Sequence, residues 1–200
     1  SAQETQSQSR IDEIVVTAEF NDIDAYNISS SISVITENDI FKRNANHLED
    51  LLFITPNVNY SSGASRGKFY QIRGIGERSE FTEPVNYSVG VIIDGIDFTG
   101  IALGASTFDV KQVEVLRGPQ GTLYGANALA GLINIVSNDP TEDFYSEISG
   151  SISEVGGKDF GVIISNSNDN NFGYRLGFKN SKSYGFIKNV FLNRDDTNDI

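Results

Sequence analysis

Closely spaced glycines are the first feature of this sequence that could do chemistry, because glycine-rich loops can bind phosphate through their backbone amides. The segment Gly118–Gly125 contains three glycines, but no Lys-Ser or Lys-Thr pair follows its last glycine, as a nucleotide-binding P-loop requires. A second pair, Gly74 and Gly76, has Ser79 at the position where the dinucleotide fingerprint needs a third glycine. The sequence therefore predicts no nucleotide site.

Catalytic and metal-binding side chains are also scarce. The chain has 1 histidine and 0 cysteines, so it cannot form a histidine cluster, a thiolate metal site or a cysteine nucleophile. His47 stands three residues before Asp50 near an expected helix start, which favours a capping role. Carboxylates such as Asp94, Asp97 and Asp109 leave a hydrolytic enzyme as an alternative, although their spacing does not indicate two acids at a fixed separation. We predict no catalytic residue, no metal and no cofactor.

The overall composition narrows the classes of partner. The formal net charge is −12, which repels phosphate groups and excludes nucleic acid as an expected partner. No run of about 18 apolar residues occurs, so no transmembrane helix is predicted. Methionine is absent, which indicates that residue 1 is not the initiator. The polar residues 1–11 predict a flexible tail, such as one behind a removed signal peptide or one trimmed in another way.

Residues 12–140 combine short apolar runs with helix signals, and they predict a small mixed sheet with short helices. Thr36 and Asp39 have the spacing of a helix N-cap and its reciprocal carboxylate, and Asp94-Gly95 is a typical turn pair. The expected strands cover residues 32–36, 57–61, 69–74, 89–96, 113–116 and 132–136, and the expected helices cover 37–43, 46–54 and 121–129.

Residues 141–200 differ in pattern, because strand signals and polar turns make up almost all of this part. In residues 172–179, aromatic and leucine side chains alternate with glycine, arginine and lysine, which predicts a strand with one apolar and one polar face. Neighbouring strands are expected at about 145–154 and 159–166, a length that spans a bilayer when the strand is tilted. Taken alone, this pattern favours a half-buried sheet of a soluble domain over a lipid-facing sheet, and both remain open.

One long block carries a specific resemblance. Residues 113–136 closely resemble the signature of the plug domain of TonB-dependent outer-membrane receptors. The resemblance extends to residues 71–74 and 91–95, to residues 12–18, which look like the TonB box of that family, and to residues 183–189, which look like its early barrel. The match follows the family's order from residue 12 to residue 200, and it makes the lipid-facing interpretation the favoured one.

The resemblance implies an α+β fold, in which a small mixed-sheet plug with short helices is followed by antiparallel strands of an incomplete transmembrane β-barrel. It divides the chain into a tail (1–11), a TonB box (12–18), a plug domain (19–140) and the first barrel strands (141–200). A barrel of about 22 strands needs about 220 strand residues at about 10 each, whereas residues 141–200 supply three or four strands. We therefore expect a receptor fragment whose last part packs poorly or pairs as an isolated meander.

The resemblance also assigns roles to individual residues. The TonB-binding residues would be Asp12, Glu13, Ile14, Val15, Val16, Thr17 and Ala18. The plug arginines expected to pair with carboxylates of the barrel wall are Arg73 and Arg117. The apex loops expected to face the ligand contain Ser65, Arg66, Arg78, Tyr87, Phe98 and Leu103. The glycines expected at turns or close backbone approaches are Gly74, Gly118, Gly121, Gly125 and Gly131.

The activity implied is TonB-dependent uptake of a scarce, large nutrient across the bacterial outer membrane. The external ligand would be a ferric siderophore, haem, cobalamin or an oligosaccharide, and residues 141–200 would contact membrane lipid. Ligand binding would release the TonB box into the periplasm, where it would add a strand to TonB. The alternative is a soluble periplasmic binding or signalling module that does not transport.

Overall fold

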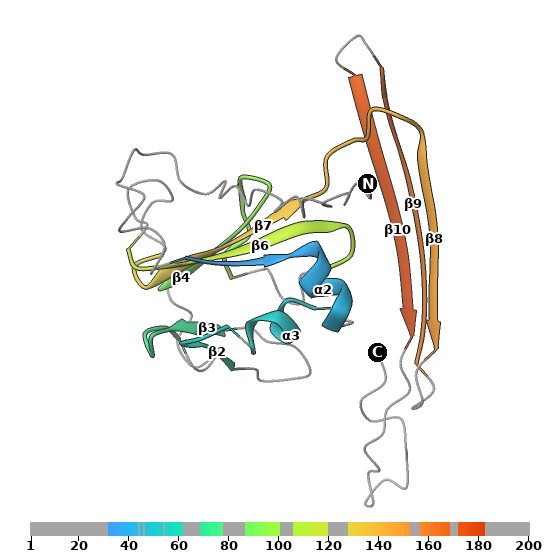
Figure 1. Ribbon diagram of the computed structural model, residues 1–200. Helices are drawn as coiled ribbons and strands as arrows, with labels where there is room; N and C mark the ends of the chain where they lie inside the picture. Colours follow the sequence, from blue (N-terminus) through green and yellow to red (C-terminus); the bar gives the residue numbers. More distant parts are fainter. Residues whose placement is uncertain are drawn as a thin grey trace, which may run out of the picture.

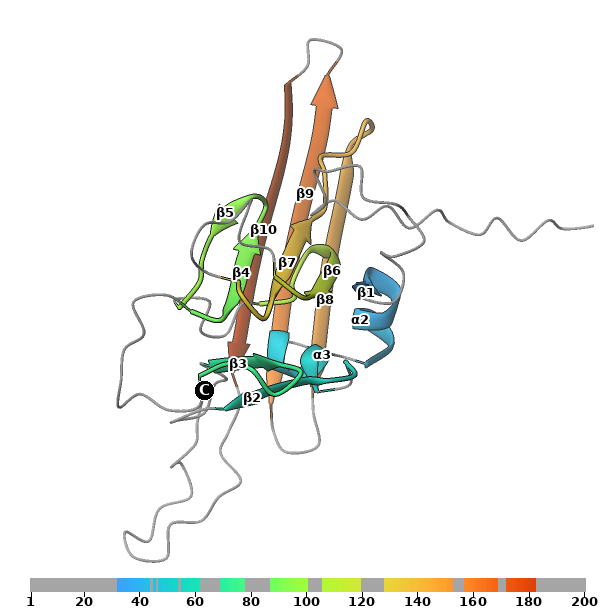
Figure 2. The same ribbon diagram turned by 90° about the vertical axis from the view of Figure 1, so that its left-hand side faces the viewer.

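The computed structural model describes residues 32–43, 45, 47–53, 55–61, 69–77, 87–100, 106–119, 128–152, 157–168 and 172–182. These residues form two parts, which lie side by side in Figure 1 and overlap in the view of Figure 2. We call the part between Ile32 and Ser137 the mixed domain, and the three strands that follow it the meander sheet. Among the described residues, no helix is both long enough and apolar enough to cross a membrane.

The mixed domain is built on a five-stranded sheet with the strand order β1-β6-β7-β4-β5. Its strands are β1 (Ile32–Thr36), β4 (Val89–Ile93), β5 (Ile96–Asp97), β6 (Val110–Arg117) and β7 (Gly131–Ser137). Only β4 and β7 pair in parallel, and the other neighbours are antiparallel. Asp94 and Gly95 join β4 to β5 with φ of 48° and 81°, as a type I′ turn requires, which confirms the predicted turn pair.

Two short helices and a hairpin lie on one side of this sheet (Figure 1). They are α2 (Glu37–Arg43), α3 (Leu48–Leu52) and the hairpin strands β2 (Val58–Ser61) and β3 (Phe69–Ile72). Their buried side chains form one apolar cluster with the facing side chains of the sheet, including Leu48, Leu51, Leu52, Ile72, Val113, Val115 and Ile133. Burial of this cluster is the main stabilisation available to elements as short as these.

The opposite face of the sheet combines a smaller apolar cluster with a buried polar group. The cluster contains Ile92, Leu116, Ala128 and Leu132. Beside it, the side chain of Glu114 is fully buried and accepts hydrogen bonds from the side-chain amides of Gln112 (2.6 Å) and Asn134 (3.1 Å). These two donors offset part of the cost of removing a carboxyl group from water.

Both helices begin at the capping residues that their sequences predict. The Thr36 hydroxyl donates to Asp39 Oδ2 at 2.8 Å, and the Thr36 amide donates to the same oxygen at 3.1 Å. These hydrogen bonds lower the pKa of Asp39, because they favour its charged form. His47 is the N-cap of α3, and its amide donates to Asp50 Oδ2 at 3.1 Å, as the spacing of these two residues indicates.

The meander sheet consists of three antiparallel strands in the order β10-β9-β8 (Figure 2). They are β8 (Tyr145–Ile152), β9 (Lys158–Asn168) and β10 (Phe172–Lys182). The pairing places Ile148, Val162 and Phe178 side by side on one face. Many apolar side chains of this face are exposed, whereas serines, glycines and charged residues occupy the face toward the mixed domain.

The α+β prediction is confirmed, with a small mixed sheet and short helices followed by antiparallel strands. Strand β6 begins at residue 110, three positions before its predicted start, because Val110 already pairs with Ser137 of β7. The helix predicted at 121–129 falls mostly outside the described residues, but its end is wrong. Ala128 has a φ of 73° and its amide donates to the Tyr87 carbonyl at 3.0 Å, which a helix would not allow.

The described strands pair as a separate meander sheet, as predicted, but the expectation of poor packing is wrong for them. Arg175 of β10 makes an ion pair with Asp109 of the mixed domain at 2.6 Å. In addition, the Thr141 amide donates to the Ser165 hydroxyl at 2.9 Å, which fixes the connection to the inner side of β9. The polar face of the sheet therefore has a partner within the same chain.

The first prediction concerns Gly131, the first residue of β7. It has a φ of 156°, and a Cβ there would lie 2.3 Å from the Leu116 carbonyl oxygen. We expect Gly131→Ala to lower the free energy of unfolding by about 2 kcal/mol or more, because it adds a clash to backbone strain. The control is Gly118→Ala, where φ is 122° but nothing lies within 4 Å of the added Cβ. The measurement is urea unfolding in detergent, followed by circular dichroism. Equal losses of unfolding free energy in the two variants would contradict the prediction.

The second prediction uses the Thr36–Asp39 cap. The folded-state pKa of Asp39 is lowered, so its contribution to stability is present above the unfolded-state pKa of about 4 and is lost as the pH falls through the folded value. We expect Asp39→Ala to speed amide exchange in residues 37–43 at pH 7, with a cost of about 1 kcal/mol. At acidic pH, after correction for intrinsic exchange, the difference from the parent chain should shrink. A difference that grows on acidification would contradict the assignment.

Candidate functional site

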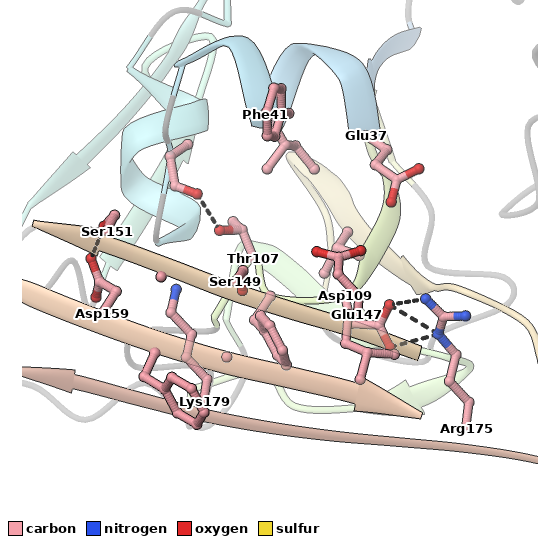
Figure 3. Close-up of a pocket in the computed structure, with 18 of the residues that line it drawn as sticks. Glu37, Phe41, Thr107, Asp109, Glu147, Ser149, Ser151, Asp159, Arg175 and Lys179 are labelled. Carbon is pink, nitrogen blue, oxygen red and sulfur yellow. Dashed lines mark hydrogen bonds and ion pairs between the residues drawn. The ribbon is translucent and has the colours of Figure 1, made fainter. Parts of the chain in front are cut away.

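A cavity of about 390 Å³ lies between the mixed domain and the meander sheet. Figure 3 shows its two walls, with Glu37 and Phe41 of α2 on one side and polar side chains of the meander strands on the other. Thr107 closes part of the first wall, and its hydroxyl donates to the Ala45 carbonyl at 2.5 Å. The cavity is thus bounded by segments that are far apart in the sequence.

Asp109 and Arg175 form the main polar contact across this junction. The Arg175 Nε lies 2.9 Å and 2.7 Å from the two carboxylate oxygens of Asp109, and its Nη2 lies 2.6 Å from Oδ1. The Arg175 and Asp109 side chains are only 12% and 16% exposed. The Arg175 guanidinium also lies 5.6 Å from the centroid of the Tyr145 ring. A charge-assisted contact through several hydrogen bonds fixes orientation as well as distance.

The remaining polar groups of the cavity are also held by neighbouring side chains. Asp159 accepts hydrogen bonds from the hydroxyls of Ser151, at 2.9 Å, and Ser181. Lys179 places its Nζ 5.8 Å from the centroid of the Phe108 ring. Within the part of the chain that the structure describes, no group of three or more His, Cys, Asp or Glu side chains is arranged to hold a metal ion. The arrangement suits a contact between two parts of the chain.

Arg117, one of the two arginines singled out in the sequence, joins three segments of the mixed domain. Its Nη2 donates to the Ser33 hydroxyl of β1, and its Nε donates to the Pro56 carbonyl at 3.2 Å. Arg73 lies in a turn with a φ of 54°, and its amide donates to the Asn57 carbonyl at 2.8 Å. Partial burial and then the nearby positive charge of Arg73 lower the pKa of Arg117. The two cations therefore lie close enough to influence each other.

Of the six residues expected at the ligand-facing apex, the structure describes Tyr87 and Phe98. Tyr87 packs its ring on Gly100, where a Cβ would lie 2.7 Å from the ring. Phe98 is half-buried against the larger apolar cluster. The other four, Ser65, Arg66, Arg78 and Leu103, lie outside the described residues, as do all residues of the segment Asp12–Ala18.

The glycines singled out in the sequence fall into two groups. Gly74, Gly118 and Gly131 have φ of 79°, 122° and 156°, whereas Gly121 and Gly125 lie outside the described residues.

The three carboxylates considered for an enzyme each have a structural partner. Asp94 Oδ1 accepts a hydrogen bond from the Ser137 amide, and Asp97 Oδ1 accepts one from the Thr99 amide, both at 2.8 Å. Asp109 is the partner of Arg175. The bonds of Asp94 and Asp97 hold turns of the mixed domain, and the bonds of Asp109 hold the mixed domain against the meander sheet.

Sequence reasoning did not assign Phe108, Asp109 and Arg175 to a common contact. The alternation in β10 placed Arg175 and Lys179 on its polar face, and this was the available signal for one half of the junction. The other half lies in a turn 66 residues earlier, and no local pattern links the two.

Comparison with known proteins identifies a family for this chain. Residues 24–132, more than half of the chain, match the family model described as the TonB-dependent receptor plug domain. The vitamin B12 transporter BtuB of Vibrio vulnificus (strain YJ016) is 31% identical over 67% of this chain and 21% of the transporter. The pesticin receptor of Yersinia pestis is 32% identical over 64% of this chain and 19% of the receptor. The chain thus spans about a fifth of the length of these relatives.

Solved structures give the same result. The ferric yersiniabactin uptake receptor FyuA from Yersinia pestis superposes with a TM-score of 0.73 at 25% identity, over 84% of this chain and 27% of that receptor. The ferric-catecholate import receptor Fiu from E. coli K12 superposes with a TM-score of 0.61 at 28% identity, over 78% of this chain and 21% of the receptor. Both matches cover more of the chain than the mixed domain alone.

The third prediction concerns the Asp109–Arg175 ion pair. We expect Arg175→Met to lower the free energy of unfolding by about 2 to 4 kcal/mol, because it leaves a poorly hydrated carboxylate without its guanidinium. Adding Asp109→Asn should recover part of the loss. The matched control is Lys111→Met, since Lys111 and Asp139 pair at 3.0 Å but are 51% and 80% exposed, and it should cost less than about 1 kcal/mol. Equal losses in urea unfolding for Arg175→Met and Lys111→Met would contradict the assignment.

Proposed function

The chain belongs to the TonB-dependent receptor plug domain family, and we propose on this basis that it serves TonB-dependent uptake of a scarce, large nutrient across the bacterial outer membrane. In this proposal residues 19–140 are the plug, and residues 141–200 are the first strands of the surrounding wall. The observation that carries the proposal is the two-faced meander sheet, which follows the plug domain directly and turns its polar face toward it.

The outward face of the meander sheet has the composition expected of a surface in lipid. Ile148, Ile152, Phe172, Leu176 and Phe178 are all more than half exposed. Soluble monomers rarely expose a contiguous apolar surface of this kind, whereas outer-membrane strands present apolar residues outward and polar residues inward. This face supports contact with membrane lipid, and it disfavours the soluble periplasmic module considered as an alternative.

We propose roles for the residues that the family pattern singles out. Residues 12–18 would be the TonB box, which binds TonB in the periplasm by adding a strand to its sheet. Arg73 and Arg117 lie close together, and a pair of cations of this kind would attract carboxylates of the wall. Tyr87 and Phe98, together with the loops that carry Ser65, Arg66, Arg78 and Leu103, would face the external ligand. None of these roles requires catalysis, and we propose a transporter component without enzymatic activity.

We propose the class of ligand from the names of the relatives. The relatives named above are a vitamin B12 transporter and receptors for ferric yersiniabactin, ferric catecholates and pesticin. The small ligands among these are large metal chelates, and so we propose a ferric siderophore or a cobalamin-like chelate for this chain. Haem and oligosaccharides remain within the same proposal, since loops decide specificity on a common scaffold.

The fourth prediction tests the TonB contact. We expect the full chain in detergent to bind the periplasmic C-terminal domain of TonB, and deletion of residues 12–18 to abolish the heat of binding in calorimetry. Val15→Pro should weaken binding strongly, because proline removes a backbone donor that an added strand needs.

A deletion of equal length, residues 2–8, is the matched control. Because it keeps residues 12–18, it should leave the affinity within about twofold of the parent chain, a difference of about 0.4 kcal/mol. Undiminished binding after loss of residues 12–18 would refute the proposed TonB box.

A further inference from the structure

The turn that precedes β6 is packed into the inner face of the meander sheet. The Phe108 ring lies over Gly161 of β9 and Gly177 of β10, which both point toward the mixed domain. A Cβ at Gly161 would lie 2.9 Å from the ring, and a Cβ at Gly177 would lie 3.0 Å from it. Since real side chains rarely approach so closely, the ring occupies a seat that exists because these two residues lack side chains.

The connection between the two parts is packed in the same manner a short distance away. Pro140 lies against Gly173 of β10, where a Cβ would be 2.8 Å from the proline Cβ. The Thr141 amide and hydroxyl both reach the Ser165 hydroxyl, at 2.9 Å and 3.1 Å. The Ser165 side chain is fully buried. Glycines of the inner face thus make room for both segments: Gly173 for Pro140 of the connection, and Gly161 and Gly177 for Phe108 of the turn.

Polar contacts surround the Phe108 seat. Asp109, the next residue, makes the ion pair with Arg175, and its Oδ1 also accepts a hydrogen bond from the Asn138 side-chain amide at 3.2 Å. Lys179, two residues after Gly177, lies over the other side of the seat with its Nζ 5.8 Å from the ring centroid. The contact therefore combines shape, charge and a cation–π interaction, which fix one arrangement.

The strand topology places this contact at one end of the two central strands β6 and β7. Val110, the first residue of β6, pairs with Ser137, the last residue of β7, so both strands end at the meander sheet. In the described sheet, edge strand β1 pairs with β6 alone. Its first residue, Ile32, pairs with Leu116 at the far end of β6, whereas its last residue, Thr36, pairs with Gln112 near the attachment. Hairpin β2–β3 has no strand partner in the mixed sheet. Among the described elements, β1 thus has one strand neighbour in the mixed sheet and hairpin β2–β3 has none, whereas β6 and β7 each have two.

We propose that the Phe108–Asp109 turn is a fixed anchor, seated on Gly161 and Gly177 and tied by Arg175, on which β6 and β7 stay attached to β8–β10 when β1 and hairpin β2–β3 open. This goes beyond the proposed function, because it states which part of the plug opens and which part remains. The physical reason is that segments joined by many mutual contacts open together, and the packing of Phe108 on Gly161 and Gly177 and the Asp109–Arg175 ion pair join the two parts at this turn.

Hydrogen exchange of the whole chain in detergent, at increasing urea concentrations, tests the order of opening. We expect peptides from β1 and from β2–β3 to exchange first, through openings that leave β6, β7, β9 and β10 protected. Peptides spanning residues 106–117 and 131–141 should then lose protection together with those of β9 and β10. Loss of protection in β6 together with β1, while β9 and β10 remain protected, would overturn the anchor.

A double-mutant cycle tests the packing of the Phe108 ring against Gly177. Gly177→Val fills the space of the Phe108 ring, and we expect at least tenfold faster exchange in residues 106–113 at low urea. In a Phe108→Ala background the same substitution should have a much smaller effect, because the ring it displaces is gone. The matched control is Gly150→Val on the outward face of β8, where the nearest atom to an added Cβ is 3.6 Å away, and exchange in residues 106–113 should not change. Equal effects of Gly177→Val in both backgrounds would reject the seat.

The outcome is separable from that of the proposed function. Neither substitution lies in residues 12–18, so each variant should retain TonB binding in calorimetry. If TonB binding is normal but Gly177→Val has the same effect with and without Phe108→Ala, the anchor alone is rejected. If TonB binding is absent but the effect of Gly177→Val depends on Phe108, the proposed TonB contact is rejected and the anchor stands.

Discussion

The alternation of side chains between the two faces of a strand is the constraint on which this structure depends. Along β10, Leu176 and Phe178 take one face, so Arg175, Gly177 and Lys179 must take the other. The polar face meets the mixed domain, and there the arginine reaches Asp109 while the glycines admit an aromatic ring. One pattern thus gives the sheet an exposed apolar face and a polar face that packs against a domain of the same chain.

Features that depend on neighbouring residues could be predicted from the sequence. The Thr36–Asp39 cap, the Asp94-Gly95 turn and the two faces of β10 follow from spacings of one to three residues, where local geometry decides the outcome. The plug assignment was accessible for another reason, since residues 113–136 form a long and specific block that the family comparison confirms through residue 132. Strand β6 was predicted too short because pairing with β7 extends it.

The junction could not be predicted because its parts are distant in sequence. Phe108 and Gly177 are unremarkable residue types until the fold brings a turn against a strand. Likewise, Asp109 is one of many acidic residues in a chain of net charge −12, and nothing local marks it as the partner of Arg175. Ala128 shows the same limit on a smaller scale, because a hydrogen bond to the distant Tyr87 carbonyl overrides its helix propensity.

The buried Glu114 group bears on the register that β6 and β7 adopt when the domain folds. Glu114 and its amide donors Gln112 and Asn134 sit on one face of β6 and β7, and the larger apolar cluster sits on the other. A slip of one residue in the pairing of these strands would move the carboxyl group in among leucines and valines, at a cost of several kcal/mol. Glu114, Gln112 and Asn134 therefore favour a single alignment of β6 and β7 when the domain folds.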